Sequence, residues 1–334
     1  MTSHIAILGA TGAVGQEFLS ILEERETPID TLRLLASSRS AGMKAPFRGS
    51  DITVEEVGPR SFDGIEFALF SAGADSSRKW AEVAVKDGAR VIDNSSAFRM
   101  EPDVPLVIPE INAHAIGDAP IIANPNCSTI IMNMAVWPLH RKWPVRRIVV
   151  STYQAASGAG RQAMIELETQ SRDVLDGKPV MPRVFPHQAA FNLFSHNTTI
   201  DDRGYNTEEI KMVNETRKIF GAPDLAITAT CIRVPVLRAH SESINLTFAE
   251  PITEQQARET LSQAPGITVV DNREINCFPM PIEATGKDNC LVGRIRSDLS
   301  QPDGRGLELF VSGDQLRKGA ALNAVQIMES ILKG

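Results

Sequence analysis

The chain is poor in cysteine and in aromatic residues, and it lacks the features that mark several protein classes. Four cysteines in 334 residues, with no Cys-x-x-Cys spacing, exclude a disulfide framework and leave no metal site to predict. No apolar run approaches the roughly 18 residues of a membrane-spanning helix, and a strand expected from Ile5 leaves no room for a signal peptide. A net charge of −7 without any basic run argues against nucleic-acid binding. We therefore expect a cytoplasmic protein that binds neither membranes nor nucleic acids.

What remains is the composition of an ordinary globular protein, with 43% hydrophobic and 22% charged residues. The length suggests two domains. In the first part, apolar runs at 5–8, 32–36, 67–70 and 90–94 alternate with helical patterns. This alternation predicts an α/β fold with an N-terminal Rossmann-type, doubly wound parallel sheet. After Leu139 the later strands and helices predict an α+β domain with a mixed sheet.

One stretch, residues 121–136, combines a strand, a polar turn and a helix. Its apolar start predicts a short buried strand, Asn-Pro-Asn at 124–126 predicts a turn, and the apolar run at 130–139 predicts a buried helix that the preceding Ser-Thr pair caps. Cys127 would lie beside unpaired N–H groups at the helix start, where a thiolate is stabilised and an oxyanion could bind. The alternative is a small thiol that packs a core, but the polar turn around it favours a nucleophile.

A glycine-rich turn follows the first predicted strand. Gly9-Ala-Thr-Gly-Ala-Val-Gly15 stands between that strand and a helical pattern, which is the context of a dinucleotide fingerprint, although the spacing is Gly-x-x-Gly-x-x-Gly. Gly12 would let the backbone approach a pyrophosphate at the helix N-terminus, and Gly15 would allow close packing of helix and strand. A turn of this kind without a ligand is the alternative.

The end of the second predicted strand indicates which dinucleotide would bind. Sites for NAD carry an acidic residue there for the ribose 2′-hydroxyl, whereas this chain has Ser37-Ser38-Arg39-Ser40. Hydroxyl groups and a guanidinium suit a 2′-phosphate, so the sequence predicts NADP. A solvated Ser-Arg loop is the alternative reading.

Other charged residues stay ambiguous from their patterns alone. Arg99 could bind phosphate or be a surface cation. Glu208 and Lys211 fall on the polar face of an amphipathic helix, where ordinary solvated ion pairing explains them. Arg233 ends a predicted strand, and because Pro235 breaks that strand, Arg233 and His240 can converge.

Together these motifs resemble those of the aspartate-β-semialdehyde dehydrogenases, over the whole chain and in the same order. The matching segments are Gly9-Ala-Thr-Gly-Ala-Val-Gly15, Asn124-Pro-Asn-Cys-Ser-Thr129, Gln154-Ala-Ala-Ser-Gly158 and Arg233-Val-Pro-Val-Leu-Arg-Ala-His240. The resemblance implies an NADP-binding Rossmann domain of residues 1–126 and 315–334. It also implies a catalytic and dimerisation domain of residues 127–314, with a homodimer that buries the second sheet.

The resemblance further implies a role for each matching residue. Cys127 would be the acyl-thioester nucleophile, His240 the general acid/base, and Gln154 the residue that orients the intermediate. The implied substrate-binding residues are Arg233 for the α-carboxylate, Glu208 for the α-amino group, Arg99 and Lys211 for phosphate, and Asn126. The implied cofactor-binding residues are Gly9, Thr11, Gly12, Ala13, Val14, Ser37, Ser38, Arg39, Ser40, Ser157, Gly158 and Gln315.

The implied reaction is the NADP-dependent reduction of L-aspartyl-4-phosphate to L-aspartate-4-semialdehyde with release of inorganic phosphate. It belongs to the biosynthesis of lysine (through diaminopimelate), threonine, methionine and isoleucine. A thiolate is needed because an acyl phosphate is a poor hydride acceptor, whereas a thioester is a good one.

Three other functions compete with this one. N-acetyl-glutamyl-phosphate reductase uses the same logic, but Glu208 argues against it because an acetylated nitrogen carries no charge. A NADP-binding redox sensor would leave Arg233, Glu208 and Lys211 without a shared purpose. A thiol hydrolase would leave the glycine turn unexplained.

Overall fold

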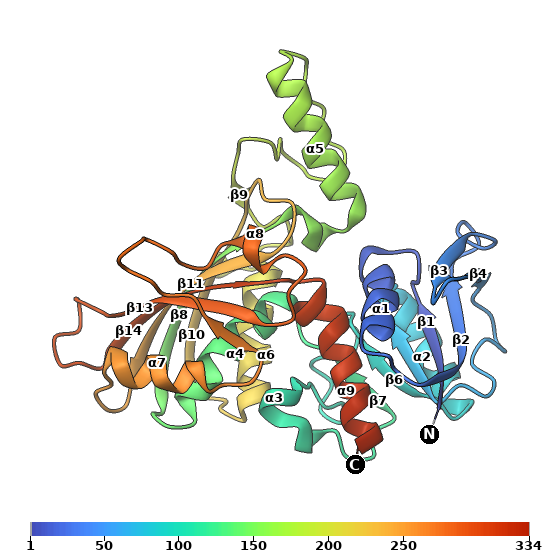
Figure 1. Ribbon diagram of the computed structural model, residues 1–334, viewed down its shortest axis with the longest axis horizontal. Helices are drawn as coiled ribbons and strands as arrows, with labels where there is room; N and C mark the ends of the chain where they lie inside the picture. Colours follow the sequence, from blue (N-terminus) through green and yellow to red (C-terminus); the bar gives the residue numbers. More distant parts are fainter. Residues whose placement is uncertain (1, 334) are drawn as a thin grey trace. The chain divides into compact units, whose positions relative to one another are not determined.

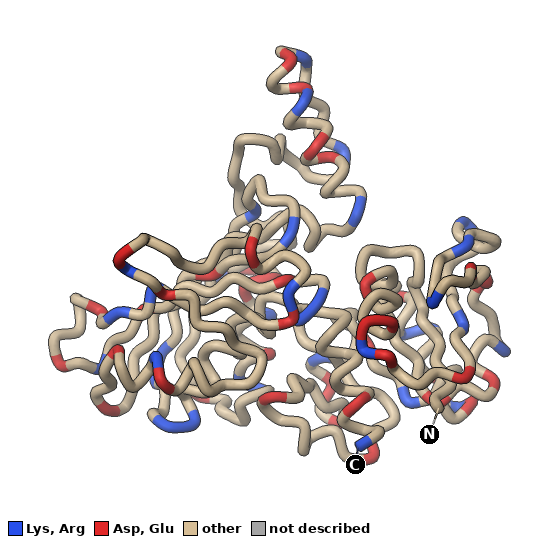
Figure 2. The backbone as a smooth tube through the Cα atoms, viewed as in Figure 1, with Lys and Arg blue, Asp and Glu red and all other residues tan. Residues whose placement is uncertain are grey.

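The computed structural model describes residues 2–333, and these form two compact units. One unit contains the chain up to Asn126 together with the segment from Ala320 onward, and the other is Cys127–Gly319. The second passage between the units thus lies after Gly319, later in the chain than the predicted boundary at Gln315. Figure 2 shows basic and acidic residues interspersed in both units. Among the described residues, no helix is long and apolar enough to cross a membrane.

The first unit is built on a seven-stranded sheet in the order β3-β4-β2-β1-β5-β6-β7. Its strands are β1 (Ser3–Leu8), β2 (Ile29–Ala36), β3 (Lys44–Phe47), β4 (Ser50–Glu56), β5 (Phe67–Phe70), β6 (Arg90–Asp93) and β7 (Ile121–Ala123). Every pair from β4 to β7 is parallel, and only the edge strand β3 runs antiparallel. This order confirms the predicted Rossmann-type parallel sheet.

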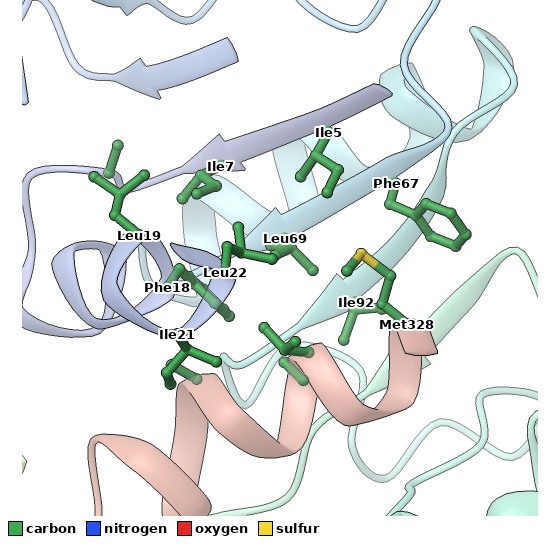
Figure 3. Packing of buried hydrophobic residues seen from close by; sticks show 14 of the residues in the cluster. Ile5, Ile7, Phe18, Leu19, Ile21, Leu22, Phe67, Leu69, Ile92 and Met328 are labelled. Atoms are coloured by element: carbon green, nitrogen blue, oxygen red, sulfur yellow. The ribbon is translucent and has the colours of Figure 1, made fainter. Parts of the chain in front are cut away.

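Helices cover both faces of this sheet (Figure 1). They are α1 (Ala13–Glu24), α2 (Ala74–Lys86), α3 (Pro109–Asn112), the 3-10 turn Ala113–Ala115 and α9 (Leu322–Lys333). Alternate residues of β1 divide between the faces, because successive strand side chains point in opposite directions. Ile5 and Ile7 pack with α1 and with Met328 of α9 (Figure 3), whereas Ala6 and Leu8 pack on the α2 side.

The second unit is built on a mixed seven-stranded sheet in the order β12-β13-β14-β11-β8-β10-β9. Its strands are β8 (Val145–Gln154), β9 (Phe194–Ser195), β10 (Ala226–Arg233), β11 (His240–Phe248), β12 (Ile267–Val269), β13 (Cys290–Ser297) and β14 (Gly306–Gly313). β10 runs parallel to β8 and β12 parallel to β13, and the other pairs are antiparallel. The predicted mixed sheet is confirmed.

The helices of this unit leave one face of its sheet uncovered. They are α4 (Cys127–His140), the 3-10 turn Ala156–Ala159, α5 (Arg161–Leu175), α6 (Thr207–Phe220), α7 (Glu254–Ser262) and α8 (Pro281–Ala284). α4, α6 and α7 pack on one face, and α5 extends away from the sheet (Figure 1). On β8, Val150 and Gln154 are buried on the helix side, whereas Tyr153, which points to the other face, is 39% exposed.

One sequence prediction about local structure was wrong. A single helix from Gln315 to Leu332 was expected, but the chain forms a π-helical turn at Arg317–Ala321 before α9. The chain turns before His240, as Pro235 predicts, and His240 is the first residue of β11. The hairpin of β3 and β4 was not predicted, because β3 is short and contains Pro46, which disfavours strands.

Candidate active site

A cavity of about 600 Å³ opens at the carboxyl ends of β1 and β2 in the first unit. Its lining includes Leu8, Gly9, Thr11, Gly12, Ala36, Ser37, Ser38, Arg39, Ser40, Glu56, Val57, Ser71, Ala72, Asp75, Ser76, Lys79 and Trp80. This edge is where open parallel sheets bind their ligands. The predicted glycine turn and the predicted Ser-Arg loop therefore meet in one cavity.

The glycine turn has the geometry of a phosphate-binding turn. Gly9 has a φ of +91°, and a Cβ there would lie 2.4 Å from Ser71 O. A Cβ at Gly15 would lie 2.2 Å from Gly9 O, so only glycine allows α1 to pack this closely. The N-cap of α1 is Gly12, which provides no side-chain cap, and the first turn has no acidic residue. The helix start therefore suits an anionic pyrophosphate.

Two cations line the cavity: Arg39, which follows β2, and Lys79 of α2. Arg39 is exposed, and Lys79 Nζ lies 4.6 Å from the centre of the Trp80 ring. The carboxylates of Glu56 and Asp75 line the same cavity. The donor set thus combines hydroxyl groups and cations for a phosphate with an aromatic surface beside them.

Arg99, the predicted phosphate ligand, also belongs to the first unit. It is 7% exposed, and its Nε and Nη2 donate to Asn124 O at 2.9 Å and to Asn94 O at 2.8 Å. These carbonyl groups fix the guanidinium plane beside the Asn-Pro-Asn turn. Asn126 is buried as well, at 6% exposed.

Cys127 is the first residue of α4 and follows β7 after a short turn, which confirms the predicted strand-to-helix position. Ser128 and Thr129 lie inside the helix, because α4 begins at Cys127 and not at Ile130 as predicted. The surroundings of Cys127 are tight, because a Cβ at Gly319 would lie 3.0 Å from Cys127 Cβ. A thiolate at this position would benefit from the helix dipole.

Three predicted site residues lie at neighbouring strand ends in the second unit. Arg233 pairs with Gln154 across β10 and β8, and the pairing of Ser241 with Tyr153 brings His240 next to the same end. A Cβ at Gly158 would lie 3.0 Å from His240 Nε2 and 3.2 Å from Arg233 Nη1. The predicted convergence of Arg233 and His240 is thereby confirmed.

His240 is held in one tautomer. The backbone N–H of Ala155 donates to its Nδ1 at 3.0 Å, so Nδ1 carries no proton and the neutral ring bears its hydrogen on Nε2. Burial, together with the nearby Arg233 cation, lowers the pKa of His240 to about 3. Nε2 is buried and has no hydrogen-bond partner among the described residues. His240 therefore offers an N–H donor beside Gly158.

Arg233 is 3% exposed and anchored at both ends of its fork. Nη1 donates to Ala155 O at 2.6 Å, and Nη2 lies 2.9 Å from His196 Nε2. Burial lowers the pKa of Arg233, whereas the nearby Cys127 and Glu208 act against that shift. Because a guanidinium stays protonated in proteins, Arg233 is a fixed cation of the site.

Gln154 connects Ser128, the neighbour of Cys127, with α6. Its Nε2 donates to Ser128 Oγ at 2.9 Å and to Glu208 Oε1 at 3.2 Å. Lys211 Nζ donates to Glu208 Oε2 at 3.1 Å. Glu208 is only 4% exposed, so it joins Gln154, Arg233 and His240 in one buried polar cluster, whereas the partly exposed Lys211 lies at its edge.

The start of α6 explains why Glu208 points into the sheet. Asn206 and Glu209 form a capping box, in which the Asn206 side chain accepts from Glu209 N and the Glu209 side chain accepts from Asn206 N. Glu209 Oε1 also accepts from the backbone N–H of Cys231 at 2.9 Å. The first turn of α6 is thereby tied to β10, which fixes Glu208 beside the strand end.

The remaining predicted cofactor residues form a second group near His240. Gln315 Oε1 accepts from Ala239 N at 2.9 Å, and Gln315 Nε2 donates to Ser157 Oγ. Gln315 and Ser157 are both 2% exposed, so these contacts are sheltered from water. They fix the loop that carries Gly158.

Three residues of these sites were not found from the sequence: His196, Ser128 and Lys79. His196 meets Arg233 only because the two-residue strand β9 pairs with β10, and so short a strand has no sequence pattern. Lys79 lies in the second turn of α2, where its sequence position indicates only a surface cation. Ser128 was considered only as a cap. Among the described residues, no group of three or more metal-ligating side chains could hold a metal ion.

Comparison with known families matches both units. The family described as "Semialdehyde dehydrogenase, NAD binding domain" matches residues 4–119, which include the cavity. The family described as "Semialdehyde dehydrogenase, dimerisation domain" matches residues 136–318. The cavity thus lies in a domain for a nicotinamide cofactor, and the second sheet lies in a domain that indicates an oligomer.

Individual relatives cover the whole chain. The aspartate-semialdehyde dehydrogenase of Synechocystis sp. is 54% identical over 99% of this chain and 97% of its own. The crystal structure of aspartate semialdehyde dehydrogenase II from Vibrio cholerae complexed with ASA has a TM-score of 0.96 and 43% identity, covering 100% and 99% of the two chains. The Candida albicans enzyme with NADP has a TM-score of 0.78 and 25% identity, covering 99% and 98%.

Proposed function

Because the chain belongs to the aspartate-semialdehyde dehydrogenase family, we propose that it reduces L-aspartyl-4-phosphate to L-aspartate-4-semialdehyde with NADPH and releases inorganic phosphate. The enzyme is thus an oxidoreductase of amino-acid biosynthesis. One observation carries the proposed mechanism: a neutral His240 N–H and the Arg233 cation meet beside Gly158, while Gln154 contacts the neighbour of Cys127.

Cys127 is the proposed nucleophile. Its thiolate attacks the acyl carbon of the aspartyl phosphate, a carbon–sulfur bond forms, and the carbon–oxygen bond to phosphate breaks. The position at the start of α4 supports this role, because the helix dipole stabilises the thiolate. With Nδ1 accepting from Ala155 N, the neutral His240 ring has no free lone pair on Nε2, so it is not the base that takes the thiol proton.

His240, the proposed acid/base residue, acts in the reductive step as a neutral hydrogen-bond donor. When NADPH is bound, its nicotinamide supplies the hydride that reduces the thioester. The carbonyl oxygen then gains charge, and the Nε2–H of His240 donates to it. The resulting thiohemiacetal oxyanion collapses as the carbon–sulfur bond breaks, which releases the aldehyde and restores the Cys127 thiolate. Gln154 orients the intermediate from the side of Ser128.

Substrate recognition is proposed to divide among four charged residues. Arg233 binds the α-carboxylate with its planar fork, and Glu208 binds the α-amino group. Lys211 and Arg99 bind the phosphate, and Asn126, which precedes Cys127 in the chain, completes the substrate site. The Vibrio cholerae relative complexed with ASA supports a ligand of this class.

NADP is the proposed cofactor, with its pyrophosphate at Gly9, Thr11 and Gly12 and the following residues Ala13 and Val14. The cavity supports a 2′-phosphate, because Ser37–Ser40 and Lys79 supply hydroxyl groups and cations. Ser157, Gly158 and Gln315 are proposed to bind the nicotinamide end. The Candida albicans relative with NADP supports the same choice.

A homodimer through the open face of the second sheet is the proposed assembly. That face carries partly exposed aromatic side chains, Tyr153 and Phe310, whose ring centres lie 6.1 Å apart. Burying such side chains is a common source of interface energy. We further propose that the enzyme is cytoplasmic and serves lysine, threonine, methionine and isoleucine biosynthesis. Aspartate semialdehyde, for which its relatives are named, is an intermediate common to these routes.

One assay tests the proposed reaction in its reverse direction. Purified enzyme is given aspartate semialdehyde and NADP with or without inorganic phosphate, and the nicotinamide absorbance is followed. The proposal expects NADP reduction that requires phosphate. Reduction at the same rate without phosphate, or no reduction, would show that the proposed reaction is wrong.

A further inference from the structure

His196 contacts the Arg233 guanidinium but has no part in the proposed reaction. β9 pairs with the end of β10, and the backbone N–H of His196 donates to Cys231 O at 2.9 Å. The backbone of His196 is therefore anchored at the edge of the second sheet. From this anchor its Nε2 lies 2.9 Å from Arg233 Nη2.

The direction of this hydrogen bond determines the state of the His196 ring. A guanidinium has only donors, so His196 Nε2 accepts and the ring hydrogen is on Nδ1, which lies 3.5 Å from Thr198 Oγ1. Burial lowers the pKa of His196 to about 4. The Glu208 carboxylate opposes this shift, whereas the cations of Arg233 and Lys211 add to it. At neutral pH the ring is thus an uncharged acceptor.

Two uncharged acceptors therefore orient the Arg233 fork. Ala155 O accepts from Nη1 and His196 accepts from Nη2, while Nε is buried without a partner among the described residues. The plane is fixed, and the Nε side stays available for a carboxylate. An acidic residue in place of His196 would also accept, but it would neutralise the charge that attracts the substrate.

On the basis of the proposed function, we propose that His196 is a positioning residue that orients Arg233 for the substrate's α-carboxylate without neutralising its charge. His196 acts through Arg233 and not on the reacting atoms. Side chains at position 196 should therefore rank by hydrogen bonding and charge. A role in packing alone would rank them by size.

Three variants test this ranking: His196→Gln, His196→Glu and His196→Leu. Gln keeps a neutral acceptor, Glu is its charged match in size, and Leu removes the acceptor. We expect Leu and Glu to raise the KM for semialdehyde about tenfold and to lower kcat, and Gln to stay within about threefold of wild type. The KM values for phosphate and NADP should stay near wild type. Equal damage by Gln and Leu, wild-type behaviour of Glu, or a parallel change in all three KM values would overturn the proposal.

The pH dependence separates positioning from proton transfer. The charged and titratable groups that act on His196 are Glu208 and Lys211 of α6, Arg233 of β10 and His240 of β11. The kcat/KM profile of His196→Gln should keep the wild-type shape between about pH 5.5 and pH 9, because the ring of His196 is neutral throughout that range. A limb near pH 6.5 that disappears in this variant would show that His196 transfers a proton, and the proposal would be wrong.

A binding measurement makes the result independent of turnover. In the Cys127→Ser background no thiohemiacetal forms, so calorimetry reports only the non-covalent affinity for aspartate semialdehyde. The His196→Leu double variant should bind about tenfold more weakly than the His196→Gln double variant. If the wild-type enzyme failed to reduce NADP, the proposed function would be wrong, yet this affinity order would still decide the role of His196. Equal affinities would refute the positioning role even in an active enzyme.

Discussion

The cofactor cavity of the first unit and the polar cluster of the second unit hold their charged groups in opposite ways. In the cavity, Arg39 and Lys79 are exposed, and the rigid part is the backbone around Gly9, with its φ of +91°. In the cluster, Arg233 is 3% exposed and His240 is fully buried, and each is fixed by hydrogen bonds to the backbone of Ala155.

The difference in burial predicts a difference in how substitutions behave. Exposed charges are screened by water and salt, so each contributes a modest and independent amount to binding. Buried polar groups depend on one another, because removal of one partner leaves another without its hydrogen bond. We therefore expect small, additive effects in the cavity and large, coupled effects in the cluster.

The largest effect is expected from Cys127→Ser in the second unit. A hydroxyl is similar in size to a thiol but is not ionised near neutral pH, so turnover should fall at least about a hundredfold. NADP affinity, measured by fluorescence titration, should stay unchanged. Cys277→Ser is the control, since Cys277 is partly exposed and lies outside the site. A Cys127→Ser enzyme with more than about a tenth of wild-type turnover would disprove the nucleophile assignment.

Arg233→Lys should give the next largest effect. The charge remains but the planar fork is lost, so the reacting carbon shifts away from Cys127 and kcat/KM falls about a hundredfold. Saturation series in semialdehyde should show that kcat falls and KM rises together. A rise in KM alone would mean that only the charge of Arg233 matters, and the buried cluster would then behave like the exposed cavity.

The cavity should respond less strongly to Arg39→Ala. Loss of this charge-assisted contact should cost about 1.5–3 kcal/mol of NADP affinity, toward the lower end because Arg39 is exposed, with little change for NAD. Lys79→Ala should act in the same direction, and the double variant should be additive. Arg78→Ala, one residue before Lys79 in α2, is the control. Strong non-additivity, or equal effects on both cofactors, would contradict the comparison.

Much of the fold was predictable because its signals are local. The apolar run Phe67–Phe70 is β5 as predicted, and the periodic stretches Arg161–Leu175 and Glu254–Ser262 are α5 and α7. The π-helical turn at Arg317–Ala321 was not predictable, because its one helix-disfavouring residue, Gly319, does not indicate this wider kind of turn. A tertiary contact marks it instead, since Gly319 lies against Cys127. Short π-helical turns are frequent at functional sites.

The site residues likewise divide into those indicated by local sequence motifs and those that depend on contacts between distant segments. Cys127 and the Gly9 turn depend on the segments next to them in the chain, so motifs indicated their local structure. His196 reaches Arg233 through the pairing of strands distant in the sequence. From the sequence, Glu208 appeared solvated because helix periodicity does not reveal that the start of α6 is tied to Cys231.

A buried carboxyl in the second unit gives a test through stability. Glu242 is fully buried, neither carboxyl oxygen has a partner among the described residues, and burial raises its pKa well above the usual value. The folded state therefore holds a proton that the unfolded chain releases above about pH 4.3, so Glu242 costs stability as the pH rises. Glu242→Gln cannot ionise. Its Tm relative to wild type should rise between about pH 5 and pH 8, by an amount worth at least about 1 kcal/mol. A constant difference would mean that Glu242 is ionised in the folded enzyme.

The smallest effect is expected at Lys211, which is intermediate between the exposed charges of the cavity and the buried groups of the cluster. Its side chain is 27% exposed, whereas the side chain of its partner Glu208 is 6% exposed. As a partly screened point charge, Lys211 should contribute only about threefold to phosphate affinity, and Lys211→Ala should raise the KM for phosphate by that factor. The same change frees Glu208 from a competing cation, so the KM for semialdehyde should stay constant or fall. Lys218→Ala removes the same charge from the same helix and should change neither constant. Saturation series in phosphate and in semialdehyde on both variants measure these two KM values. If both rose together in Lys211→Ala, the Lys211–Glu208 pair would be a coupled part of the buried cluster, and Lys211 would not be a phosphate ligand.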